Sequence, residues 1–172
     1  MLRVYSRGVT IHIPGGTRAL INVNIEIPEK SIVAITGANG SGKSTLLMLL
    51  AGLLDSQEGR IKFRGMDIKG LEYKLRREVG IVFQDPDDQL FASTVYDDIA
   101  LGLRLLKLSE EDVKAKVHKV ARELGIEHLL DKPPYRLSGG EKHRAALATT
   151  LILNPSVLLL DEPFFRSHAT CS

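Results

Sequence analysis

The stretch GANGSGKST at residues 37–45 decides the fold of this sequence, and it reads Gly37-Ala38-Asn39-Gly40-Ser41-Gly42-Lys43-Ser44-Thr45. It matches the pattern G-x-x-x-x-G-K-[ST], whose glycines let the backbone wrap closely around phosphate groups. The N–H groups of such a loop, and the N-terminus of the following helix, attract the anion. We expect Lys43 to reach the β- and γ-phosphates and Ser44 to offer its hydroxyl to Mg²⁺. All nine residues are predicted to bind a nucleotide.

The flanking segments have the pattern that a phosphate-binding loop requires. Ser31 to Thr36 is a short, β-branched and nearly all-apolar run, typical of a strand covered on both faces. Lys43 to Leu54 is rich in leucine and indicates a buried helix. The loop is therefore predicted to lie after a buried strand and before a helix.

A second chemical element lies at Val157-Leu158-Leu159-Leu160-Asp161-Glu162, where an apolar strand ends in two carboxylates. Ligands of open α/β sheets bind at the carboxyl ends of parallel strands. Successive side chains of a strand point in different directions, so the two acids can take different roles. We expect Asp161 to hold the magnesium shell and Glu162 to polarise the attacking water. The alternative is a merely solvated strand end, which the loop at Gly37–Thr45 disfavours.

The rest of the chain reads as alternating strands and helices with a helical insert. Beyond Phe83 the pattern becomes helical up to about Leu130, and Ser109 with Asp112 resembles a capping box. An apolar helical face follows the cap, and it consists of Val113, Val117, Val120 and Leu124. Further strands are predicted at Ile21–Ile27, Arg60–Phe63 and Val79–Phe83, and a further helix at Glu141–Leu153.

Composition excludes several classes of protein. The hydrophobic fraction of 44% and the charged fraction of 26% are ordinary for a globular domain and wrong for disorder. A net charge of +2 is too small to argue for nucleic acid, so we expect none as a partner. One cysteine, Cys171, fits a reducing cytosol. Because no apolar run approaches the ~20 residues of a membrane span, we expect the protein to dock on a membrane protein.

The segment Leu137-Ser138-Gly139-Gly140-Glu141, together with the two preceding motifs, resembles the signature of the ABC ATPases. The resemblance covers essentially Leu2 to Phe164. It implies an α/β P-loop NTPase fold with a parallel core sheet, an N-terminal antiparallel β part and a helical insert. It also implies that Gln84 senses magnesium and the γ-phosphate, and that two subunits pair head to tail. Each ATP would then lie between one subunit's loop and the other's Ser138, Gly139 and Gly140.

The resemblance divides the chain into four parts. Residues 1–84 would form the P-loop core with the antiparallel β part, and residues 85–136 the helical subdomain. Residues 137–164 would carry the signature loop, its helix and the acidic strand back to the core. Residues 165–172 form a tail that departs from the family, since Phe165-Arg166-Ser167-His168 stands where the family continues with a loop ending in Leu-Asp. The core sheet is expected to be incomplete at this end.

A finer resemblance follows from Phe83-Gln84-Asp85-Pro86-Asp87-Asp88-Gln89-Leu90-Phe91. It is similar to ATPase subunits of the energy-coupling-factor and cobalt/nickel importers, and Pro14–Leu20 and Asp161–Phe164 suit the same group. This implies a peripheral subunit on the cytoplasmic face of the membrane that uses ATP and Mg²⁺ to power metal or vitamin uptake. Its partners would be a transmembrane coupling subunit, with Leu90 and Phe91 near the contact, and a second ATPase subunit, identical or paralogous.

Two other interpretations remain open at this point: a soluble ABC ATPase outside transport, and a nucleotide-binding fragment without turnover. The family's switch histidine and an inserted central strand would follow Ser172, so we expect weak turnover from these 172 residues. Related subunits also place an adenine-stacking aromatic before the loop, where this chain has Ile11-His12-Ile13-Pro14. Cargo is chosen by another subunit and is not encoded here.

Overall fold

The computed structural model describes residues 2–12, 18–69, 75 and 78–162, which fall into two compact units, Met1–Val79 and Gly80–Ser172. Each unit is described by itself. The predicted features at Pro14–Thr17 and from Pro163 to Ser172 lie outside the described residues. The side chain of His12 is likewise not described.

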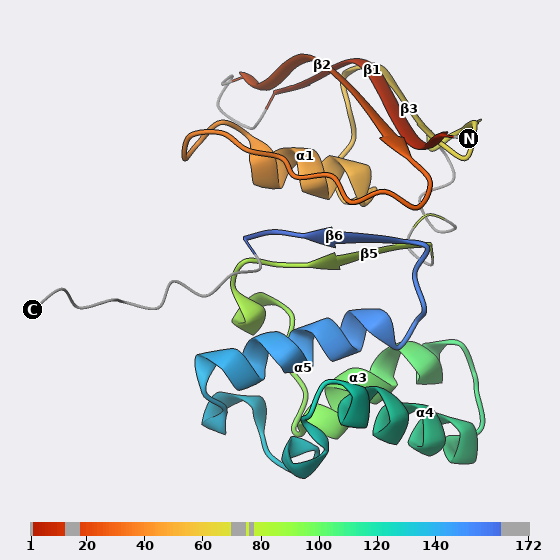
Figure 1. The fold of residues 1–172 in the computed structure, drawn as a ribbon, viewed down its shortest axis with the longest axis vertical. Helices are drawn as coiled ribbons and strands as arrows, with labels where there is room; N and C mark the ends of the chain where they lie inside the picture. The colour runs from red at the N-terminus through yellow and green to blue at the C-terminus, as the bar shows by residue number, and fades with distance from the viewer. Residues whose placement is uncertain (1, 13–17, 70–74, 76–77, 163–172) are drawn as a thin grey trace, which may run out of the picture. The chain divides into compact units, whose positions relative to one another are not determined.

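The first unit is an antiparallel sheet with one helix against it (Figure 1). The strand order is β2-β1-β3-β4, and Val4 of β1 lies opposite Ile27 of β2 and Phe63 of β3. Leucines of α1 are buried and contribute to the core, as predicted. The elements are β1 (Leu2–His12), β2 (Arg18–Pro28), α1 (Lys43–Leu50), β3 (Glu58–Phe63) and β4 (Met66–Asp67). The structure therefore confirms the N-terminal antiparallel part, while α1 ends earlier than the predicted Leu54.

The strand predicted at Ser31–Thr36 is not formed, and this expectation was wrong. The segment has no regular secondary structure, and Ile32 and Val33 are exposed. The physical reason is that a strand is defined by its hydrogen-bonded neighbours. No described strand pairs with this segment. A β-branched apolar run favours an extended chain, but it cannot supply the partner.

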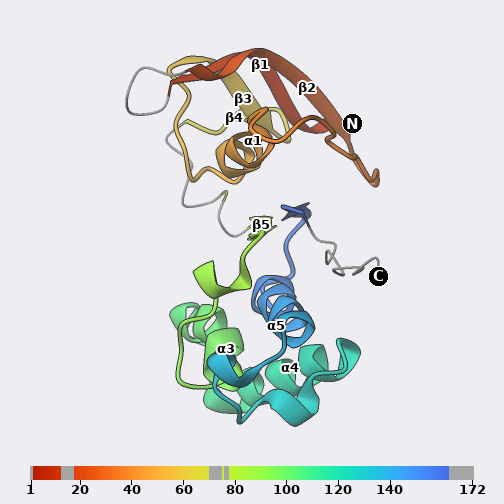
Figure 2. The ribbon, with the colours of Figure 1, turned by 90° about the vertical axis from the view of Figure 1, so that its left-hand side faces the viewer.

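The second unit places a short sheet beside a helical layer. Strands β5 (Val79–Val82) and β6 (Val157–Leu160) pair and run in the same direction (Figure 1). Helix α5 lies between this sheet and the pair α3 and α4 (Figures 1 and 2). The helical elements are η1 (Pro86–Asp88), α3 (Val95–Leu105), α4 (Glu110–Glu123), η2 (Glu127–Leu129), η3 (Pro134–Arg136) and α5 (Gly139–Leu151).

Local sequence signals explain the helices of this unit. Ser109 is the N-cap of α4, and its hydroxyl accepts from the Asp112 N–H at 3.1 Å, as the capping pattern predicts. Val113 and Val117 are fully buried, which confirms the predicted apolar face. The core also takes in Leu90, Val95, Ile99, Leu103, Ile126, Leu129, Ala145 and Ala146.

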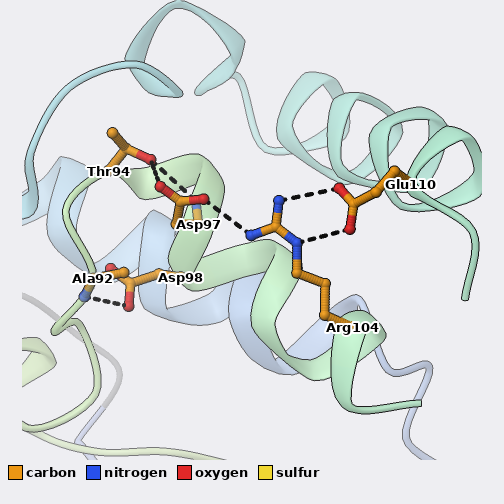
Figure 3. Close-up of polar contacts among 6 residues, drawn as sticks. All are labelled: Ala92, Thr94, Asp97, Asp98, Arg104 and Glu110. Atoms are coloured by element: carbon orange, nitrogen blue, oxygen red, sulfur yellow. Dashed lines mark hydrogen bonds and ion pairs between the residues drawn. The ribbon is translucent and has the colours of Figure 1, made fainter. Parts of the chain in front are cut away.

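A polar cluster joins α3 to α4 and to the loop before α3 (Figure 3). The Arg104 guanidinium donates through Nε and Nη2 to both oxygens of Glu110, at 3.1 Å each, and through Nη1 to Asp97 at 3.1 Å. The Thr94 hydroxyl donates to Asp97 at 2.7 Å. These hydrogen bonds hold the pKa values of Asp97 and Glu110 below their ordinary range. Among the described residues, no helix combines the length and apolarity needed to cross a bilayer.

Candidate functional site

The loop at Gly37–Thr45 leads directly into α1, whose first residue is Lys43. Gly42, the N-cap, has φ 90°, a conformation that a side chain disfavours. A Cβ atom at Gly42 would also lie 2.6 Å from the carbonyl oxygen of Ala19 on β2. Only glycine fits here, so the loop can pass this close to the sheet.

The side chain of Lys43 folds back into the loop. Its ammonium donates to the carbonyl oxygens of Gly37 at 3.1 Å and of Ala38 at 3.0 Å. The Ser41 N–H closes the same turn by donating to the Ala38 oxygen at 3.2 Å. Carbonyls are neutral partners and an ammonium has three donors, so a full positive charge and one donor remain. That charge suits an anion held in the loop.

The N-terminus of α1 adds to this field. No side chain caps the helix at Gly42. The first amides of a helix lack internal acceptors and carry partial positive charge, so they favour a phosphate there. Ser44 and Thr45 follow on the first turn and are half-buried.

The acidic pair lies at the end of β6 in the second unit, and its two members differ in environment. The Asp161 N–H donates to the Val82 carbonyl of β5 at 3.0 Å, and the residue is 8% exposed. Glu162 is exposed and has φ 45°, so the chain turns sharply after Asp161. The Gln84 amide donates to the Glu162 carboxylate at 2.8 Å. Two residues predicted to be catalytic, 78 positions apart, are thus in direct contact.

The predicted signature forms the start of α5. Ser138 is its N-cap, and the Ser138 N–H and hydroxyl both donate to one oxygen of Glu141, at 2.7 Å each. These two bonds hold the pKa of Glu141 below its ordinary range. Ser138 and Gly139 are exposed, and Gly140 is half-buried. The capping box therefore presents the serine and the glycines at the surface.

Two further residues around Gln84 were missed by sequence reasoning. The Gln89 amide reaches α5, and Lys142 of α5 forms an ion pair with Asp87 at 2.6 Å. The signal available in the sequence was the polar pair Thr149-Thr150 on a helix that is otherwise packed, since buried polar groups need partners. Nothing in the local pattern names Gln89 as that partner.

The predicted residues fall into two sets. The glycine loop belongs to the first unit, whereas Gln84, Ser138–Gly140 and Asp161–Glu162 belong to the second. No group of three or more His, Cys, Asp or Glu side chains that could hold a metal occurs in the part of the chain that the structure describes. This fits Mg²⁺, which takes one or two protein ligands and completes its shell with water and phosphate oxygens. Ser44 and Asp161 supply oxygen ligands of the kind it prefers.

Residues 20–165 match the family model described as ABC transporter. A putative ABC transporter ATP-binding protein of Archaeoglobus fulgidus is 49% identical over 157 residues, which cover 90% of this chain and 66% of that protein. The energy-coupling factor transporter ATP-binding protein EcfA of Carboxydothermus hydrogenoformans is 43% identical, over 94% of this chain and 60% of that protein.

Among solved structures, cbiO1 of Clostridium perfringens, part of the ABC transporter complex cbiONQ, superimposes with a TM-score of 0.82 at 41% identity. The match covers 94% of this chain and 66% of that chain. The chain thus spans between 60% and 66% of the length of these three proteins.

Proposed function

Because this chain belongs to the ABC transporter family, we propose that it is the ATP-binding subunit of a membrane importer and that it couples ATP hydrolysis to transport. The observation that carries the proposal is the hydrogen bond between Gln84 and Glu162, which joins the two residues that the reaction requires at the end of a parallel sheet. The family resemblance gave these two residues related roles, and their contact supports that assignment.

In this proposal the glycine loop binds the triphosphate. The retained charge of Lys43 attracts the β- and γ-phosphates, and the amides of the loop and of the first turn of α1 surround them. Binding would exchange the Gly37 and Ala38 carbonyls for phosphate oxygens as partners of the ammonium. The loop residues proposed to contact the nucleotide are Gly37, Ala38, Asn39, Gly40, Ser41, Gly42, Lys43, Ser44 and Thr45.

The oxygens of Ser44, Asp161 and Gln84 would hold Mg²⁺, directly or through water. When bound, the ion neutralises the charge that develops on the phosphates. The chain's own contribution to hydrolysis would come from Glu162, whose carboxylate accepts a proton from the attacking water. The Gln84 amide fixes the direction of that carboxylate, because it already donates to one of its oxygens.

We further propose that two such subunits, identical or paralogous, enclose each ATP. The exposed Ser138 and Gly139 support this arrangement, because they stand at a helix N-terminus, where a phosphate is favoured. The partner of this pair would be a transmembrane coupling subunit, which places the protein at the cytoplasmic face of the membrane. The names of the relatives, EcfA and cbiO1, favour a vitamin or a metal ion as cargo.

Phosphate release from Mg·ATP tests the hydrolytic role of Glu162. The Glu162→Gln variant keeps the size of the side chain and removes the base, so we expect it to bind ATP and to lose whatever phosphate release the wild type shows, by about 10²-fold or more. Equal release from both proteins would contradict the assignment.

A further inference from the structure

Three contacts fix the segment from Gln84 to Gln89 against the rest of the second unit. Gln84 contacts Glu162 at the end of β6 at 2.8 Å. Asp87 pairs with Lys142 in the first half of α5, at 2.6 and 2.8 Å. Gln89 reaches the second half of the same helix. The segment therefore lies along α5, with Gln84 at one end and Gln89 at the other.

The Gln89 side chain is the most connected of these groups. Its Nε2 lies 2.9 Å from the Ala146 carbonyl, 2.8 Å from the Thr149 hydroxyl and 2.9 Å from the Thr150 hydroxyl. Its Oε1 accepts from the Phe83 N–H at 3.5 Å, next to Gln84. One amide thus links the backbone beside Gln84 to three acceptors on α5.

The segment between the two glutamines is stiff. The Asp85 carboxylate accepts from the Asp87 N–H at 2.9 Å, and the Leu90 N–H donates to the Pro86 carbonyl at 3.0 Å. Pro86 is buried and its ring fixes one backbone torsion. Because this short turn is bonded within itself, a displacement of Gln84 is passed on to Gln89.

Helix α5 is also held tightly to β5. A Cβ atom at Gly80 would collide with the methyl group of Thr150, so the two elements meet at the closest approach that glycine permits. The Thr150 hydroxyl donates to the Ile81 carbonyl at 3.1 Å. The helix that begins with Ser138 is therefore tied to the strand that leads to Gln84.

We propose that Gln89 is a positioning residue that couples Gln84 to the first turn of α5. A contact between Gln84 and the nucleotide would shift the Gln84–Gln89 segment, and the Gln89 amide would pass this shift to α5 and its Ser138–Gly140 start. This proposal rests on the proposed function, because the stimulus is nucleotide binding. It assigns the link between the two motifs within one subunit to a single side chain.

Removing the amide leaves the fold intact. Without Gln89, the Thr149 hydroxyl still donates to Ala146 at 2.8 Å and the Thr150 hydroxyl to Ile81. Gln89→Leu keeps much of the side-chain volume and leaves neither hydroxyl without an acceptor, so it separates coupling from folding. Thr149→Ser, which retains the hydroxyl, is the matched control.

Hydrogen exchange of the 172-residue chain with and without Mg·ATP tests the coupling. Sedimentation in the same buffer identifies a concentration at which the protein is monomeric, so that no second subunit touches Ser138. We expect Mg·ATP to change the exchange rates of the amides of residues 139–142 by about fivefold or more in the wild type and in Thr149→Ser. In Gln89→Leu this change should be lost, while the dissociation constant of ATP stays within about twofold of the wild-type value.

The outcomes separate the two proposals. A wild type that binds no ATP contradicts the proposed function and the coupling with it. A wild type that binds ATP without any change at residues 139–142, or a Gln89→Leu variant that keeps the full change, overturns the coupling and leaves the proposed function standing.

Discussion

At the scale of single residues, Asp98 shows how one buried carboxylate shapes an exposed loop. Its Oδ1 accepts from the N–H groups of Phe91 at 3.1 Å and Ala92 at 2.9 Å (Figure 3). Its Oδ2 is buried and has no hydrogen-bond partner among the residues described. Burial raises the pKa of Asp98, and the two N–H donors oppose that rise. The residue thus holds the loop at a cost to its own ionised form.

We predict that Asp98→Ala lowers the free energy of unfolding by about 1–3 kcal/mol, because two backbone donors lose their acceptor. Asp98→Asn should cost less, since it keeps an acceptor oxygen and removes the buried charge. Urea denaturation of the three proteins at pH 7 measures both changes. An equally large loss in the two variants would contradict the role of Oδ1 as the acceptor.

The same carboxyl makes stability depend on pH in a defined direction. Because its pKa is raised in the folded protein, the folded state binds the proton more tightly than the unfolded chain. Its contribution is therefore lost as the pH rises from the ordinary aspartate value of 3.8 through the raised folded value. The difference in unfolding free energy between Asp98→Asn and wild type should shift toward the variant over this interval. A difference that does not vary with pH would refute this.

At the scale of secondary-structure elements, Arg104 connects α3 to the start of α4. Both of its carboxylate partners lie at the surface, where ion pairs stabilise by only ~0.2–1 kcal/mol. The bidentate geometry with Glu110 places this pair at the upper end of that range. The pair mainly fixes the angle at which one helix follows the other.

We predict that Arg104→Lys loses most of the coupling to Glu110, because an ammonium cannot form two parallel bonds with one carboxylate. A double-mutant cycle with Arg104→Ala and Glu110→Ala should give a coupling energy of roughly 0.5–1 kcal/mol that decreases at high salt. A coupling energy near zero at low salt would show that the contact does not stabilise the protein.

The elements that sequence reasoning found are those with local causes. The helix caps at Ser109 and Ser138 and the alternating pattern of β2 each act within one segment, and all three formed as expected. Ser31–Thr36 failed, because its pattern states an extended preference while its partner lies elsewhere. The contact of Gln84 with Glu162 could be anticipated only from the family, since no local pattern spans 78 residues.

The neighbours Leu90 and Phe91 show the same division. Sequence reasoning placed both near a contact surface, but Leu90 is 6% exposed and belongs to the core, whereas Phe91 is 75% exposed. Leu90 therefore cannot serve a partner, and this part of the expectation was wrong. Irregular segments lack the periodicity that would tell the inward residue from the outward one.

At the scale of the whole molecule, the exposed Phe91 leads to a prediction about the transport partner. Phe91→Asp should abolish co-purification with a co-expressed transmembrane coupling subunit, because an exposed aromatic ring in a fixed loop is a favourable contact point. Leu90→Asp is unsuitable for this purpose, because it would bury a charge. Circular dichroism checks that the Phe91→Asp variant remains folded. Undiminished co-purification would rule out this surface.

The claim on which the whole account depends is that the chain binds ATP through Lys43, and calorimetric titration with Mg·ATP tests it most directly. Lys43→Ala removes a charge-assisted hydrogen bond to phosphate, so we predict an affinity about ten- to a hundredfold weaker than that of the wild type. Lys119→Ala, which removes the same charge from the exposed face of α4, should bind ATP as the wild type does. Equal affinity of the Lys43→Ala variant and the wild type would contradict the account.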